Sequence, residues 1–465
     1  MDLKSDKRQN IQLVLDFSSL PAGEARTAGR EETESRGATH GTENPANTNQ
    51  LMEEVCEREN LKEALQQVKA NKGSGGIDGM TVEELDDYLK QHWPTIRERL
   101  FNGTYEPQPV RRVEIPKPDG GGMRKLGIPS VLDRFIQQAV MQVLQRRWDR
   151  TFSPGSYGFR PGRSAHQAVA QAQQYIAAGY GWCVDLDLEK FFDRVNHDKL
   201  MGQIAQRVED KRLRKLIRAF LNAGVMENGL ASPSVAGVPQ GGPLSPLLSN
   251  LVLDELDREL ERRGLRFVRY ADDCNIYVRS ERAGQRVMKS ITRFIIKKLK
   301  LKVNETKSAV ARPQERKFLG FSFSAGPEVK RVIAPKALER FKQRIREITR
   351  RAKSVSIEAT IAELAPYLRG WRSYFGFCQT PEVLRSLTGW VRRRLRCALW
   401  RQWKTPRRRR AALLELGGPS ALGEQYGRQR SWSLVSGSDA HSPCVAFEGL
   451  LPLARPSFIG RGALA

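Results

Sequence analysis

The chain of 465 residues carries 78 lysine and arginine residues against 52 aspartate and glutamate residues, giving a formal net charge of +26. Such an excess favours a polyanionic partner, most simply nucleic acid, because released counterions drive the binding of phosphates to basic side chains. The sequence has no apolar run long enough to cross a bilayer and no secretory signal at its start, and its six cysteines form no C-x-x-C pair. A transmembrane protein, a zinc ribbon and a disulfide scaffold are therefore disfavoured, and a reducing cytoplasm fits.

Predicted structure varies along the chain. Residues 1–50 are poor in core-forming side chains, and we expect a disordered or loose extension there. From about 105 to 325, predicted strands and helices interleave, which indicates an α+β fold class. After residue 334 the spacing is helical and the segment is very basic, and after 417 the periodicity fades. The expected elements, in chain order, are helices at 51–69 and 81–100, a strand hairpin at 110–128, helices at 131–148 and 164–177, a strand at 183–188, helices at 198–207, 211–222 and 245–260, a β-hairpin at 267–279, a helix at 291–301 and mostly strand at 309–323.

Two of these helices begin with capping signals. Thr81 is expected to cap the helix at 81–100, with Glu84 three residues later as its capping-box partner. Ser245 is expected to cap its helix, with Pro246 at the first helical position.

The sequence Tyr270-Ala271-Asp272-Asp273 lies between two apolar stretches that read as antiparallel strands. Strand alternation places both aspartates at a hairpin tip, where adjacent carboxylates repel each other. A divalent cation would relieve this repulsion, and magnesium prefers carboxylate oxygens while leaving positions open for phosphates. Taken alone, the pair is equally consistent with a solvated turn.

A second acidic stretch lies upstream, in the expected strand at 183–188. Alternation puts its apolar residues on one face and Asp185 and Asp187 on the other. Alone, these aspartates would be read as the polar face of an edge strand. Beside the two aspartates of the hairpin, a third carboxylate would complete a two-metal site, the kind that stabilises the attacking and leaving oxygens of phosphoryl transfer.

Ordered blocks across residues 55–415 resemble the reverse transcriptases encoded within bacterial group II introns. The Gly-Gly-Ile-Asp-Gly sequence at 75–79 resembles the family's N-terminal block, and the Gly-Val-Pro-Gln-Gly-Gly-Pro-Leu-Ser-Pro sequence at 237–246 resembles an internal one. Further blocks lie at 115–120, 124–129, 157–164, 301–308 and 318–321.

The resemblance implies a catalytic role for Asp187, Asp272 and Asp273, which would hold two Mg²⁺ ions. Asp187 is identified by the Phe-Phe-Asp sequence that follows it, which makes Asp185 the less favoured ligand. Leu188 would add its backbone carbonyl to the metal shell; the alternative for this residue is plain core.

The resemblance also implies roles in handling the incoming nucleotide. Lys117 and Arg124 would hold the triphosphate, although Arg124 also reads as a solvated hairpin residue. Phe192 would occupy the steric-gate position and exclude a ribose 2′-hydroxyl, whereas Gln240 would touch the nucleotide or the template. Arg160 would either contact the template backbone or brace the fingers of the polymerase.

The family's architecture is a right hand. We therefore expect fingers over residues 51–180, a palm with an antiparallel sheet over 181–325, and an all-helical thumb or maturase domain over 334–415. The tail at 416–465 would be a reduced DNA-binding segment or disordered. Many relatives carry an H-N-H endonuclease with zinc-binding cysteines there; this tail does not have the residues for one, so another source of primer is expected.

The implied partners are intron RNA, an RNA template with a DNA primer, and deoxynucleoside triphosphates, with no membrane; the implied location is the bacterial cytoplasm, at the nucleoid when the protein is on DNA. The aromatic and basic stretch at 367–375 would suit structured RNA, although Trp371 and Phe375 read more safely as core. Two alternatives stay open: a maturase that binds RNA without polymerising, and a domesticated reverse transcriptase in phage defence or a CRISPR-linked system.

Overall fold

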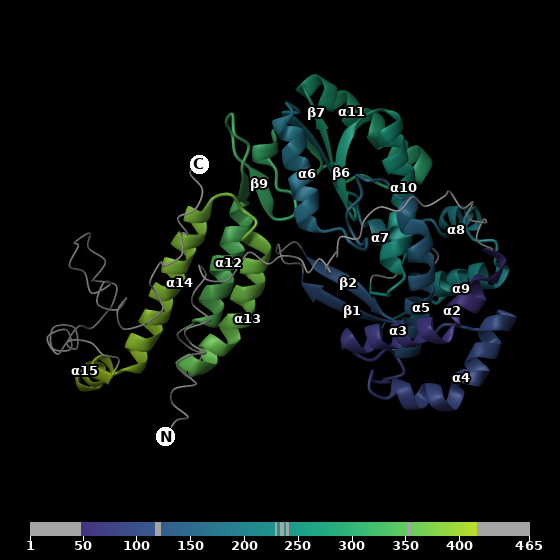
Figure 1. The fold of residues 1–465 in the computed structure, drawn as a ribbon, viewed down its shortest axis with the longest axis horizontal. Helices are drawn as coiled ribbons and strands as arrows, with labels where there is room; N and C mark the ends of the chain where they lie inside the picture. The colour runs from purple at the N-terminus through teal and green to yellow at the C-terminus, as the bar shows by residue number, and fades with distance from the viewer. Residues whose placement is uncertain are drawn as a thin grey trace, which may run out of the picture. The chain divides into compact units, whose positions relative to one another are not determined.

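The computed structural model describes residues 48–116, 122–227, 230–232, 237–238, 241–350 and 355–415. Contacts divide them into two compact units, with the boundary between Leu319 and Gly320. The predicted mixture of helices and strands is present (Figure 1). The elements of the first unit are η1 Thr48–Gln50, α2 Leu51–Val55, α3 Arg58–Ala70, α4 Leu85–Asn102, β1 Val110–Pro116, β2 Met123–Ile128, α5 Val131–Trp148, η2 Asp149–Thr151, α6 Ala165–Ala177, β3 Trp182–Leu186, α7 Phe191–Arg194, α8 His197–Ala205, α9 Lys211–Asn222, β4 Val225–Glu227, β5 Leu230–Ser232, α10 Ser245–Arg262, β6 Arg266–Tyr270, β7 Asp273–Val278, α11 Glu281–Phe294, η3 Ile295–Leu299, β8 Ala309–Ala311 and η4 Pro313–Glu315.

The two predicted helix starts differ from the structure in position. The Glu84 carboxylate does accept hydrogen bonds from Thr81, but α4 begins only at Leu85, after a turn. Ser245 is already helical: Leu244 is the N-cap residue of α10, and no side chain caps it. The expected strand at 309–323 is also interrupted, because the 3₁₀ turn η4 follows β8.

The central sheet of the first unit has the strand order β6-β7-β3-β8, and each neighbouring pair is antiparallel. The register pairs Asp185 with Asn275, so these two polar side chains share a face. Helix α11 packs on the other face, where a Cβ added to Gly284 would lie 2.5 Å from Cγ1 of Val310 and 3.6 Å from Cγ2 of Val184. The face with Asp185 also carries Tyr277, whose ring lies 5.8 Å from that of Tyr175 on α6. Helices therefore pack on both faces of the sheet, and the acidic groups lie on the face that α6 contacts.

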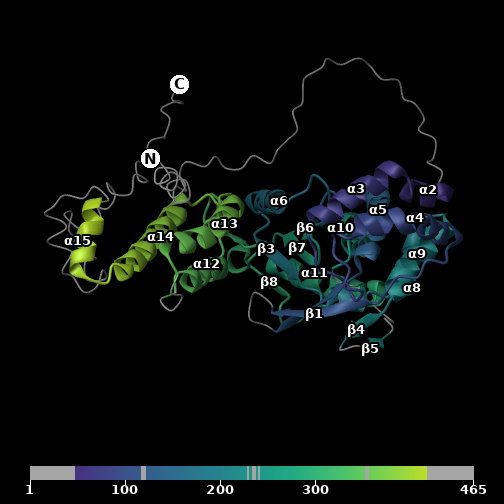
Figure 2. The same ribbon diagram turned by 90° about the horizontal axis from the view of Figure 1, so that it is seen from below.

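A second sheet of the same unit has the order β2-β1-β4-β5, and Figure 2 shows β1, β4 and β5 together below the helices. Strands β1 and β2 form the predicted hairpin, whereas β1 and β4 run parallel.

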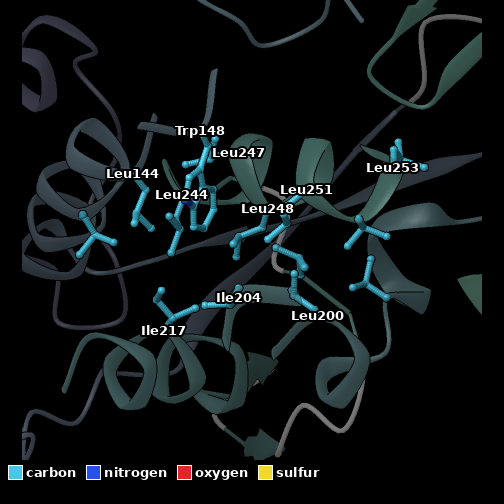
Figure 3. Packing of buried hydrophobic residues seen from close by; sticks show 14 of the residues in the cluster. Leu144, Trp148, Leu200, Ile204, Ile217, Leu244, Leu247, Leu248, Leu251 and Leu253 are labelled. Carbon is cyan, nitrogen blue, oxygen red and sulfur yellow. The ribbon is translucent and has the colours of Figure 1, made fainter. Parts of the chain in front are cut away.

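Helix α10 lies at the centre of the core of the first unit. Leu248 of this helix and Leu244, which immediately precedes it, face Ile217 of α9 and Leu200 of α8 in Figure 3. Trp148 of α5 lies close by. Burial on more than one side accounts for the apolar residues along this helix, which are Leu247, Leu248, Leu251, Val252, Leu253, Leu256 and Leu260.

The second unit begins with a hairpin of β9 Phe321–Phe323 and β10 Arg331–Ile333, and the described residues after it form only helices, as the periodicity predicts. These helices are α12 Pro335–Ile348, α13 Ile357–Phe375, α14 Pro381–Gln402 and α15 Pro406–Glu415. Their core is separate from that of the first unit and consists of Phe341, Ile345, Ile348, Ile357, Leu364, Leu368, Leu387, Val391 and Leu395.

No helix in the described ranges is long and apolar enough to cross a membrane. Five cysteines fall within these ranges and all are free thiols. Cys183 of β3 and Cys274 of β7 are buried in the central sheet, on opposite faces.

Candidate active site

The Tyr-Ala-Asp-Asp sequence forms a tight hairpin between β6 and β7. Tyr270 pairs with Asp273, so the connection consists of Ala271 and Asp272 alone. Ala271 has a φ of 56°, in the left-handed region that residues with a Cβ rarely adopt. Asp272 thus lies in the turn and Asp273 is the first residue of β7, which agrees with the predicted hairpin tip.

A buried guanidinium holds this turn in place. Arg269 is fully buried, and its Nη1 donates a hydrogen bond of 2.9 Å to the carbonyl oxygen of Ala271. The Asp257 carboxylate of α10, also fully buried, accepts from Arg269 at 2.7 and 2.6 Å. Asn250 and Ser156 accept the remaining hydrogen bonds, at 3.0 and 2.7 Å. The hairpin is therefore tied to α10 through a charged network in which Nε, Nη1 and Nη2 of Arg269 all donate hydrogen bonds.

The loop after α5 supports the other side of the hairpin. The backbone N–H of Tyr157 donates to the Arg269 carbonyl at 2.9 Å, and Asn250 Nδ2 donates to the Gly158 carbonyl at 2.9 Å. A Cβ on Gly158 would lie 2.3 Å from the backbone nitrogen of Ala271. Only glycine allows this close approach of the loop to the turn.

The two aspartates of β3 lie in different surroundings. Asp185 accepts hydrogen bonds from Nε and Nη2 of Arg316, at 2.9 and 2.5 Å, and burial raises the pKa of its carboxyl group against the lowering effect of Arg316. Asp187 follows the end of β3. Its carbonyl accepts from the Asn304 backbone at 2.8 Å, and its carboxylate lies 3.5 Å from Nζ of Lys307. Asp185 is thus occupied by an arginine, whereas Asp187 keeps only a long contact with an exposed lysine.

The carboxylates of Asp187, Asp272 and Asp273 are electrostatically coupled. Burial raises the pKa of Asp272, and repulsion from Asp187 raises it further, opposed by Arg124. Burial, followed by repulsion from Asp272, Asp185 and Asp187, raises the pKa of Asp273 to about 7.

This arrangement has the chemistry of a cation site. Carboxylate oxygens are the donors that hard divalent cations prefer, and among the described residues Arg124, Arg269, Lys307 and Lys317 only partly offset the repulsion between these carboxylates. The described ranges contain no group of three or more His, Cys, Asp or Glu side chains already close enough to hold a metal ion. The three aspartates therefore fit the donor set but are not drawn together as a closed ligand shell.

The structure locates some of the predicted nucleotide-binding residues. Arg124 is exposed on β2 and close enough to lower the pKa of Asp272. Phe192 is half-buried on α7, with its ring 5.1 Å from that of Phe191, and its carbonyl accepts from the Val238 backbone at 2.7 Å. Lys117 and Gln240 lie outside the described residues.

Leu188 and Arg160 are both in buried positions. The Leu188 side chain is part of the core, and its backbone bridges to Val303. The Arg160 guanidinium is paired with Asp149 at 2.8 Å and donates to the carbonyls of Ser153 and Ser156 at 2.6 and 3.0 Å. Of the two roles considered for Arg160, the geometry favours the brace.

The aromatic residues of α13 pack within the second unit. The Trp371 ring lies 4.3 Å from that of Phe341 and 4.8 Å from that of Phe375. Trp371 and Phe375 thus contribute to packing, in agreement with the prediction that they are core residues.

The buried network around Arg269 was not predicted from the sequence, although one signal for it was present. Asn250, Asp254 and Asp257 recur at helical spacing along α10, on the face that is otherwise leucine-rich, and all three are buried. Polar residues on a buried helix face require buried partners, and an arginine in the next apolar strand is a natural one.

Two family models match the chain. Residues 115–323 match "Reverse transcriptase (RNA-dependent DNA polymerase)", and residues 338–414 match "Group II intron, maturase-specific domain". The chain belongs to the family of group II intron reverse transcriptases with a maturase domain.

Two curated relatives illustrate this family. Protein YkfC of Escherichia coli K12 is 32% identical over 300 residues, which cover 56% of this chain and 78% of YkfC. The group II intron-encoded protein LtrA of Lactococcus lactis subsp. cremoris is 38% identical over 206 residues, which cover 44% of this chain and about a third, 34%, of LtrA. Among solved structures, a partial Cas6-RT-Cas1–Cas2 complex matches 53% of this chain and 42% of its own at 25% identity, with a TM-score of 0.35.

Proposed function

We propose that the chain is an RNA-directed DNA polymerase that also binds the RNA of a group II intron and assists its splicing and mobility. The observation that carries the polymerase proposal is the electrostatic coupling of Asp187, Asp272 and Asp273 around a rigid hairpin. The two matching family models support both activities: the reverse transcriptase model covers this hairpin, and the maturase model covers the helical unit. A cytoplasmic location and intron mobility belong to the same proposal.

The proposed architecture is the right hand of polymerases. Residues 51–180 would form the fingers, residues 181–325 the palm with the central sheet, and residues 334–415 the thumb or maturase domain. Support comes from the antiparallel order β6-β7-β3-β8 around the aspartates and from the all-helical second unit with its own core.

Two Mg²⁺ ions are the proposed cofactors, held by Asp187, Asp272 and Asp273 with help from the Leu188 carbonyl. Bound divalent ions supply charge stabilisation to attacking and leaving oxygens in phosphoryl transfer. The contribution of the chain is to hold the carboxylates in place, two of them on a fixed turn. Asp272 is fixed by the hydrogen bond from Arg269 to the preceding carbonyl, and Asp187 by the backbone bond from Asn304.

The proposed reaction is attack of a primer 3′-hydroxyl on the α-phosphate of a deoxynucleoside triphosphate, with pyrophosphate as the leaving group. Arg124 would neutralise phosphate charge near Asp272, a role supported by its lowering of the pKa of Asp272, and Lys117 would share that role. Phe192 would exclude the ribose 2′-hydroxyl, and the hydrogen bond from Val238 to its carbonyl ties it to the block that contains Gln240.

Primer extension on an RNA template, with Mg²⁺ and deoxynucleotides, tests the proposal. The wild type is compared with Asp272→Asn/Asp273→Asn and with a control, Asp87→Asn/Asp198→Asn, which removes two exposed carboxylates elsewhere. Extension by the wild type and control alone is the expected result. Extension by all three proteins would show that Asp272 and Asp273 are not part of the catalytic site. No extension by a folded wild type that binds RNA would favour a maturase that does not polymerise.

A further inference from the structure

The solvent-facing side of α11 carries a row of cations. The α11 stripe is defined by Arg282, Arg286, Lys289 and Arg293, all exposed, at successive steps of four, three and four residues. That spacing puts the four side chains on one face of the helix, over about 16 Å at 1.5 Å per residue. In the part of the chain that the structure describes, none of these four side chains has an ion pair or a hydrogen bond.

In the neighbouring helix α10, exposed arginines are paired with acidic residues of the same helix. Arg258 is bonded to Asp254 at 2.8 Å and Arg262 to Glu259 at 2.8 Å, each within one turn. Like charges three or four residues apart destabilise a helix, whereas such pairs stabilise it. Helix α11 has Glu281 as its single acidic residue, so its stripe keeps a repulsion that α10 avoids.

The stripe lies on the side of the central sheet away from Asp185. Helix α11 packs on the face that carries Val184 and Val310, and Asp185 and Asn275 point from the opposite face. A nucleic acid lying along the stripe is therefore a different segment from the strand being extended at the aspartates. The stripe contains no aromatic residue that could stack on bases, so its contacts would be to phosphates.

We propose that the α11 stripe is a docking surface for the phosphate backbone of double-helical RNA, separate from the polymerase site. This inference rests on the proposed function for its choice of RNA among polyanions. Each cation that neutralises a phosphate releases counterions, so the stripe contributes a steep salt dependence and no sequence preference.

The test compares two variants of the full chain with equal loss of charge. The stripe variant is Arg286→Gln/Lys289→Gln/Arg293→Gln, and the control is Lys62→Gln/Arg258→Gln/Arg262→Gln, whose side chains are exposed and paired within one turn. The probe is a blunt RNA hairpin of about two helical turns, without a single-stranded template, and its dissociation constant is measured from 50 to 300 mM KCl. Thermal melting checks that the stripe variant is folded. We expect it to be, because removing cations from one face of α11 relieves their mutual repulsion.

The stripe variant is expected to lower the slope of log K against log salt by about two to three, roughly one per cation, with the control changed by less than one. Equal changes in both variants would show that only net charge acts, and no change in the stripe variant would also overturn the proposal. Loss of binding to vesicles containing phosphatidylglycerol, with RNA binding intact, would assign the stripe to lipid instead. Primer extension is measured in parallel: a wild type without polymerase activity would refute the proposed function but not the stripe.

Discussion

Removal of the buried Arg269–Asp257 pair tests whether this network positions the aspartates or only holds the fold. Both side chains are fully buried, so Arg269→Met alone leaves the Asp257 carboxylate without its partner and should destabilise the protein by about 3–5 kcal/mol. Replacement of both, as Arg269→Met/Asp257→Leu, removes both charges together and should restore most of that stability. The double variant still lacks the hydrogen bond to the Ala271 carbonyl.

The lost bond is one to a charged group, worth about 1.5 kcal/mol, which is about a tenfold change in an equilibrium constant. We therefore expect the Mg²⁺ concentration for half-maximal primer extension to rise about tenfold in the double variant. Its melting temperature should stay near that of the wild type. An exposed pair, Lys90→Met/Asp87→Leu, is the control and should leave metal dependence unchanged.

Two results would refute this reasoning. A double variant with wild-type stability and wild-type metal dependence would show that the network does not order the turn. A single Arg269→Met variant as stable as the wild type in urea would show that the buried carboxylate finds another partner or a proton.

Four further predictions address single residues. Without metal, the pKa of Asp273, raised from its ordinary 3.8 to about 7, means that its ionisation opposes folding; the wild-type melting temperature should fall relative to Asp273→Asn as the pH rises from about 4 to about 7 and level off above that, and identical pH profiles would exclude this. Gly158→Ala should destabilise by about 1–3 kcal/mol in urea and weaken extension, because its Cβ would meet the Ala271 backbone. Arg160→Met should destabilise by about 3 kcal/mol yet leave RNA affinity per folded molecule unchanged; a selective loss of affinity would make it a template contact. Phe192→Val should improve ribonucleotide incorporation roughly tenfold or more in single-turnover extension, and unchanged discrimination would remove its gate role.

The sequence predicted those parts of the site that depend on local pattern. Strand alternation and a two-residue connection placed Asp272 and Asp273 at a hairpin tip, and the register Tyr270–Asp273 agrees with this. The same alternation put Asp185 and Asp187 on one face, but it could not say which of them would be engaged elsewhere. Arg316, 131 residues away from Asp185, forms that ion pair, and no local pattern identifies so distant a partner.

Long-range packing accounts for the rest that was missed. Arg269 reads as an ordinary strand residue, and its burial becomes evident only when α10 brings Asp257 beneath β6. The start of α10 also differed from the prediction, since Ser245 fits the preference for a capping serine but its backbone is helical. Local propensity was overruled there by the packing of Leu244 into the core.

The two buried thiols of the central sheet give each of its faces a chemical reporter. Burial raises the pKa of both Cys183 and Cys274, and alkylating reagents attack the thiolate, so neither residue should react while the sheet is closed. Cys274 follows Asp273 in sequence but points to the face on which α11 packs, whereas Cys183 shares with Asp185 the face that α6 contacts. Their separate labelling rates would therefore show which side of the sheet opens first, and whether metal ions slow that opening on the acidic side alone.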